Sequence, residues 1–72
     1  MKPPTIHARR DPELRCLELT RPWAGLPAGT FLRIHSHGTP LHGEGIEYRC
    51  TIVTDQGIRP FVARAAGLEV TS

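Results

Sequence analysis

The sequence lacks most of the short motifs from which an enzymatic activity is usually read. Its 72 residues contain no G-x-S-x-G, no phosphate-binding loop, no C-x-x-C and no carboxylates paired at a meaningful spacing. These absences remove the patterns typical of hydrolases, nucleotide-binding enzymes and dithiol oxidoreductases. We therefore expect a protein that is not an enzyme and that uses no cofactor.

Cysteines and long apolar runs are also scarce. The only cysteines are Cys16 and Cys50, and residues 1–10, MKPPTIHARR, contain two prolines and no apolar run of a secretory signal. Two such thiols are typical of reduced cysteines in a cytoplasmic protein. No stretch approaches the roughly 20 apolar residues that span a bilayer. We expect a cytoplasmic protein that does not bind membranes, with Cys50 as a small buried side chain.

Lysine is nearly absent, and the charges almost balance. Eight of the nine basic residues are arginine, and the formal net charge is +2 at pH 7. Residues 1–21 carry the excess of positive charge, whereas residues 22–72 carry four basic and four acidic side chains. The strongly basic surface that marks many nucleic-acid-binding domains is therefore not indicated. The length allows one domain at most, with a thin core.

Apolar and polar residues alternate between residues 29 and 54, GTFLRIHSHGTPLHGEGIEYRCTIVT. A period of two predicts a β-hairpin with one buried face, formed by residues 30–37 and 46–54 and joined by a Gly- and Pro-rich connection. The side chains expected to face the core are Leu32, Ile34, Ile46, Tyr48, Cys50 and Ile52.

Three more short strands are predicted around this hairpin. One covers residues 16–20, where a turn of helix fits the apolar spacing as well. The next, residues 58–64, follows a three-residue turn of Asp55, Gln56 and Gly57, and its internal Pro60 favours an edge or a bulge. The last covers residues 68–71, with Leu68 and Val70 facing inward. Residues 1–13, with three prolines and mixed charges, are expected to form a flexible tail.

This arrangement resembles the small Src-homology-3-like β-barrels, including the ribosomal and transcription-factor modules of the KOW type. The segments GTFLRI, YRCTIVTDQG and FVARAAGLEV carry the resemblance, which covers residues 16–71. It implies an all-β, closed five-stranded barrel over residues 14–72 that follows a disordered tail. Barrel closure removes the exposed edges of an open sheet. Polyproline binding is not implied, because there is a single tyrosine and no acidic run in the early loop.

Residues 21–29, RPWAGLPAG, are predicted to form a loop, because two prolines and two glycines in nine residues prevent regular structure. This loop contains Trp23, the only tryptophan. The side chain either folds back as a plug over the core or stays exposed as an anchor for a partner. The plug is favoured, because so small a chain needs the area that an indole buries.

A binding surface is predicted on the outward face of the three central strands. Three arginines beside two phenylalanines form a surface that can stack on bases and pair with phosphates, or bind a protein. The alternative is that the phenylalanines are covered and the arginines are solvated. The residues of this predicted surface are Phe31, Arg33, His35, His37, Arg49, Arg59 and Phe61, with Trp23 as a possible further anchor.

A histidine cluster, HSHGTPLH at residues 35–42, is the candidate for a metal site. His35 and His37 are expected to project from the same face of a strand, and His42 could turn back towards them. Three imidazoles suit zinc, copper, nickel or iron. Histidines at outward and loop positions commonly bind no metal, so no resident metal is expected.

Three functional hypotheses follow. The first is a non-catalytic module that binds another protein, as an accessory or regulatory subunit. The second is an RNA- or DNA-binding module of the KOW type that uses Arg33, Arg49, Arg59 and the basic tail. The third is a metal-binding protein built on His35, His37 and His42.

Overall fold

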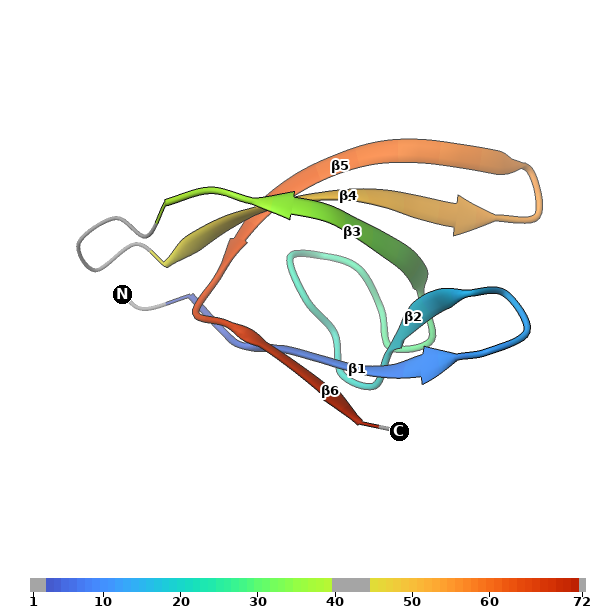
Figure 1. The fold of residues 1–72 in the computed structure, drawn as a ribbon, viewed down its shortest axis with the longest axis horizontal. Helices are drawn as coiled ribbons and strands as arrows, with labels where there is room; N and C mark the ends of the chain where they lie inside the picture. Colours follow the sequence, from blue (N-terminus) through green and yellow to red (C-terminus); the bar gives the residue numbers. More distant parts are fainter. Residues whose placement is uncertain (1–2, 40–44, 72) are drawn as a thin grey trace.

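The computed structural model describes residues 3–39 and 45–71. They form six strands in one mixed sheet, in the order β5-β4-β3-β2-β1-β6 (Figure 1). The strands are β1 (Ile6–Asp11), β2 (Cys16–Leu19), β3 (Phe31–His37), β4 (Ile46–Thr54), β5 (Gly57–Ala65) and β6 (Leu68–Thr71). Helices are absent from these residues, including any that could cross a membrane. The predicted all-β class is confirmed, and residues 16–19 are a strand.

The closed five-stranded barrel is wrong, because the sheet has six strands and stays open. Its edges are β5 and β6, which are consecutive along the chain but are not paired with each other. The chain turns away after Ala65, and β6 pairs in parallel with β1. The turn is fixed by backbone hydrogen bonds from Ala66 N to Pro4 O and from Ile6 N to Gly67 O, both 2.9 Å.

The flexible tail is also wrong for residues 6–11, which form β1. This strand lies between β2 and β6, and Ile6 and Ala8 are 0% and 1% exposed. The prolines that suggested disorder lie just outside the strand, at positions 3, 4 and 12. The charge of Arg9 is matched by Glu18 on β2, 2.8 Å away. At least one charge of this segment is therefore part of a cross-strand pair.

The core lies between the curled sheet and the loop that joins β2 to β3, which folds back over it (Figure 1). The inward positions predicted on β3 and β4 are confirmed: Leu32, Tyr48, Cys50 and Ile52 are buried, and Ile34 and Ile46 are half-buried. The core cluster consists of Ile6, Ala8, Leu19, Trp23, Leu32, Tyr48, Cys50 and Ala65.

On β6, Leu68 and Val70 point inward as predicted, since they pair with the buried Ile6 and Ala8, but they are not buried. Leu68 and Val70 are 36% and 37% exposed, because β6 is an edge of the open sheet and borders a cleft.

The β4–β5 turn lies where it was predicted, and Gly57 adopts a positive φ of 125°. However, Gly57 already pairs with Thr54, so only Asp55 and Gln56 lie between the paired positions. Pro60 lies on an edge strand, as expected. The register of β5 against β4 is therefore shifted by one residue from the prediction, which moves every β5 side chain to the opposite face.

Candidate functional site

The predicted binding surface is divided between the two faces of the sheet. Phe31 pairs with Val53, so it lies on the face away from the core. Arg59 pairs with Ile52 and Phe61 with Cys50, and both partners are buried. Arg59 and Phe61 therefore belong to the core-facing side, which contradicts their predicted outward position. The cause is the one-residue shift in the β4–β5 turn.

A β-bulge in β3 separates the two histidines of the predicted metal cluster. The bulge lies between Ile34 and Ser36, and His35 is its extra residue. Because the bulge inverts the alternation, His35 forms a hydrogen bond with the outward Thr51, whereas His37 pairs with the buried Tyr48.

The expected common face of His35 and His37 is therefore wrong. His42 lies outside the described residues. Within residues 3–39 and 45–71, no three His, Cys, Asp or Glu side chains are gathered as metal ligands.

The Trp23 side chain packs over the core, as predicted from the small size of the chain. The alternative prediction, an exposed anchor for a partner, is wrong. The side chain is 2% exposed, and its Nε1–H donates to the carbonyl of Arg64 at 3.2 Å. Its ring meets Phe61 edge to face, with the centroids 5.8 Å apart. This packing, which is typical of aromatic pairs in a core, occupies both rings. Neither is free to stack on a base.

The outward side chains of three neighbouring strands still form a continuous surface, which we call the outer β3–β5 face. One row across the strands is apolar and joins Phe31, Val53 and Ile58. Ile58 is 68% exposed, and Val62, further along β5, is 56% exposed. The members of this face are Phe31, Arg33, His35, Ser36, Glu47, Arg49, Thr51, Val53, Ile58, Pro60, Val62 and Arg64.

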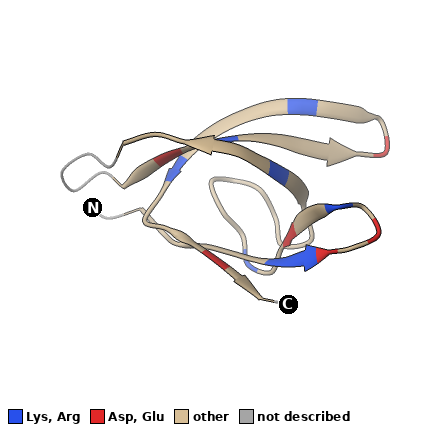
Figure 2. Cartoon of the chain, viewed as in Figure 1, with Lys and Arg blue, Asp and Glu red and all other residues tan. Residues whose placement is uncertain are grey.

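The charged residues of the outer β3–β5 face are Arg33, Arg49, Arg64 and Glu47, which pairs with Arg64 across the strands. In Figure 2, basic residues lie on β3, β4 and β5, and the acidic residue of these strands, Glu47, lies near the start of β4. The nearest carboxylate belongs to Glu47, 3.7 Å from the Arg49 guanidinium. Such a long and exposed ion pair contributes little stability, so the guanidinium is available to a partner.

The two thiols are not activated nucleophiles. Both cysteines are buried and free. Burial raises the pKa of Cys50 from its ordinary value of 9.0 to about 11. Burial, followed by the Asp11 carboxylate, also raises the pKa of Cys16, against the opposing charge of Arg33. Both groups are neutral thiols at pH 7, which disfavours nucleophilic chemistry.

The Cys50 thiol is expected to make stability fall at alkaline pH. Its folded-state pKa lies above the unfolded value, so its contribution is complete below pH 9 and is lost as the pH rises to about 11. Urea unfolding of the wild type and of Cys50→Ala, below pH 9 and near pH 11, checks this. The stability difference between the two proteins should shrink at the higher pH. An unchanged difference would exclude Cys50 as the cause.

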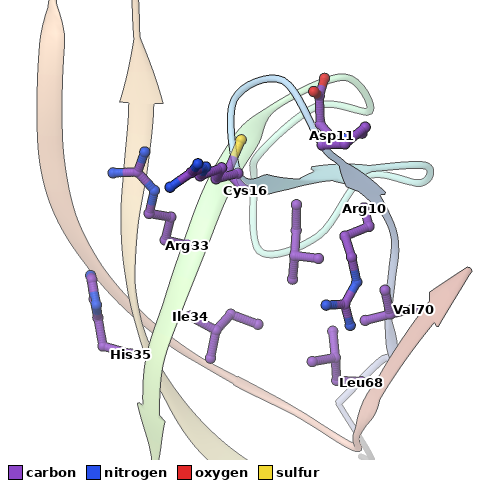
Figure 3. A pocket seen from close by; sticks show the side chains of 11 residues that line it. Arg10, Asp11, Cys16, Arg33, Ile34, His35, Leu68 and Val70 are labelled. Carbon is purple, nitrogen blue, oxygen red and sulfur yellow. The ribbon is translucent and has the colours of Figure 1, made fainter. Parts of the chain in front are cut away.

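A second surface feature is an open cleft of about 690 Å³ between β3, the β1–β2 hairpin and β6 (Figure 3). Sequence reasoning missed it. Arg10 falls in the predicted tail, and Leu68 and Val70 in the predicted core. Figure 3 shows Arg10, Ile34, Leu68 and Val70 around the same space. The sequence does contain one signal for the cleft, the alternation of apolar and polar residues in β6. This alternation shows that one face of the strand is apolar, but it does not show which residues cover that face.

Two surfaces of the described residues are therefore suited to a ligand. The outer β3–β5 face is broad, partly apolar and basic. The cleft is concave, apolar at its floor and basic beside it. Comparisons of this chain with models of protein families, with curated proteins and with solved structures find no match.

Proposed function

We propose that this chain is a small non-catalytic module that binds another protein through the outer β3–β5 face. The observation that carries the proposal is the exposure of Ile58 and Val62, at 68% and 56%, next to the half-buried Phe31 and Val53. Large apolar side chains gathered on one face of a small domain are typical of a protein interface. An accessory or regulatory protein would use such a face.

The chemistry of this face indicates the chemistry of its partner. Its apolar row favours a partner with aliphatic or aromatic side chains. Arg33 and Arg49 favour carboxylates placed beside them, since a guanidinium pairs well with a carboxylate. Pro60 lacks an N–H on the free edge of β5, which weakens pairing with an added strand. The expected contact is therefore through side chains of the face.

Nucleic acid is the alternative ligand, as the resemblance to KOW-type modules suggested. Two observations weigh against it. Phe61 and Trp23 pack against each other in the core, and Arg59 lies on the other side of the sheet from Arg33 and Arg49. The predicted set of stacking and phosphate-binding groups is therefore divided between the two faces of the sheet. Protein binding is the better supported function.

Ile58→Glu is expected to weaken partner binding strongly without unfolding the protein. A charge at the centre of an apolar contact should weaken binding at least about tenfold, as at an interface hot spot. The side chain is 68% exposed, so stability should change by less than about 1 kcal/mol. The measurement is quantitative capture of proteins from a lysate of the source organism by immobilised wild type and variant, with nuclease present and at high salt.

The matched control is Val70→Asp, which places a charge on an exposed apolar residue of β6, a strand that does not belong to this face. It should retain the partner that Ile58→Glu loses. Equal loss in both variants would contradict the assignment of the face. Captured nucleic acid that disappears with salt would favour the alternative, because phosphate contacts release counterions.

A further inference from the structure

The cleft between β3 and β6 contains Arg10 and four apolar side chains from the same face of the sheet, and its lining also includes Asp11, Arg15, Arg33 and His35. Leu17 pairs with Arg10 across the β1–β2 hairpin, so both point to one side. Strand register adds Ile34 from β3, and Leu68 and Val70 from β6, to that side. All five residues line the cleft. Residues of four strands therefore converge on one space.

The volume of the cleft and the apolar side chains at its base are typical of a small-molecule site. Its volume of about 690 Å³ falls within the range of about 300–1,000 Å³ that is usual for ligand pockets. Leu68 and Val70 remain more than a third exposed, although they face the inside of the curled sheet. Covering them with an apolar group would remove that area from water, which is favourable.

Arg10 supplies a positive charge that the described residues do not neutralise. The neighbouring Arg9 lies on the other face and pairs with Glu18, at 2.8 Å. The Asp11 carboxylate accepts hydrogen bonds from the backbone N–H groups of Glu13 and Leu14, at 3.0 and 3.1 Å, so it is engaged in closing the turn. Figure 3 shows the Arg10 side chain extending towards Leu68 and Val70. Its guanidinium therefore lies beside the apolar floor.

We propose that this cleft binds a small amphipathic anion. Its apolar chain or ring lies on Leu17, Ile34, Leu68 and Val70, and its carboxylate or phosphate pairs with Arg10. Arg33 and His35 of the outer β3–β5 face also line this cleft, and in Figure 3 their side chains leave β3 on the side away from Ile34. Arg10, Leu68 and Val70 lie on β1 and β6, which do not belong to that face. Substitutions at these three positions therefore test the cleft separately from the proposed protein interface.

The test is a titration of the isotopically labelled protein with dodecanoate and with dodecyl phosphate, each below its micelle concentration, followed by amide chemical shifts. We expect saturable 1:1 binding, with the largest shifts in β6, in β2 and around Ile34. Arg10→Gln should weaken binding about tenfold, as expected for loss of a hydrogen bond to a charged group. The control Arg9→Gln changes the other face of the same strand and should bind within twofold of the wild type.

A second variant addresses the apolar floor. Val70→Asp, at an exposed edge position, should abolish binding of both anions, whereas Ile58→Glu on the outer face should leave it unchanged. Stronger binding of dodecanoate identifies a carboxylate head group, and stronger binding of dodecyl phosphate identifies a phosphate. The proposal is overturned if neither anion binds saturably. It is also overturned if the shifts map to the outer β3–β5 face, or if Arg9→Gln and Arg10→Gln weaken binding equally.

Discussion

Trp23→Ala is expected to leave the protein largely unfolded at room temperature. The side chain is 2% exposed and is one of the largest fully buried groups in the core. Truncation of a buried tryptophan to alanine costs about 3–5 kcal/mol. In a domain of about 70 residues a single core rarely supplies more than about 3–5 kcal/mol of stability, so this loss is as large as the whole stability. Far-UV circular dichroism and proton chemical-shift dispersion measure the loss without requiring the indole signal.

Trp23→Phe is the matched control for this prediction. It keeps a ring in the plug but removes the donor that bonds to the carbonyl of Arg64. We expect it to fold, with a stability loss of about 1–3 kcal/mol for the unsatisfied carbonyl and imperfect packing. A Trp23→Ala variant with native dispersion and an unchanged urea midpoint would show that the loop does not complete the core.

Gly45→Ala is the second substitution with a large expected effect. Gly45 has a φ of +77°, which favours glycine. A Cβ at this position would lie 2.5 Å from the backbone oxygen of Ala65 and 2.5 Å from Cγ of Pro3. The left-handed conformation and the overpacking together should cost about 2–5 kcal/mol. Urea unfolding of the variant measures this loss.

Gly25→Ala separates the two causes. Gly25 has nearly the same φ, +83°, but no heavy atom lies within 4 Å of the position that its Cβ would take. Only the conformational cost of about 1–2 kcal/mol should remain. If both variants lost the same stability, close contact between Gly45 and Ala65 could not be the source of the effect. A difference between them would measure that contact.

Local alternation predicted the central part of this fold correctly. The inward positions of Leu32, Tyr48 and Cys50 follow from a period of two, because one face of each strand had to be buried. The predicted outward positions are wrong wherever one residue more or fewer shifts the alternation along a strand. The shorter β4–β5 turn moved Arg59 and Phe61 to the core side, and the bulge at His35 separated it from His37. Turn length and bulges depend on tertiary packing, which alternation does not reveal.

The cleft could not be predicted from the sequence for a different reason. It depends on parallel pairing between β1 and β6, which lie near opposite ends of the described chain. Arg10 looked like part of a charged tail, and Leu68 and Val70 looked like core residues. Only their long-range arrangement makes them one site. Local patterns carry no information about which distant strands become neighbours.

Pairing between β1 and β6 also has a consequence for the order of folding. Ile6 pairs with Leu68, so this contact closes a loop that includes almost the whole described chain. Long loops carry the largest entropic cost of closure, whereas the β3–β4 and β4–β5 pairs join neighbours in sequence. We therefore expect the central hairpins to form early and β6 to dock last. The docking of β6 brings Leu68 and Val70 opposite β3, so the final step of folding is also the step that creates the cleft.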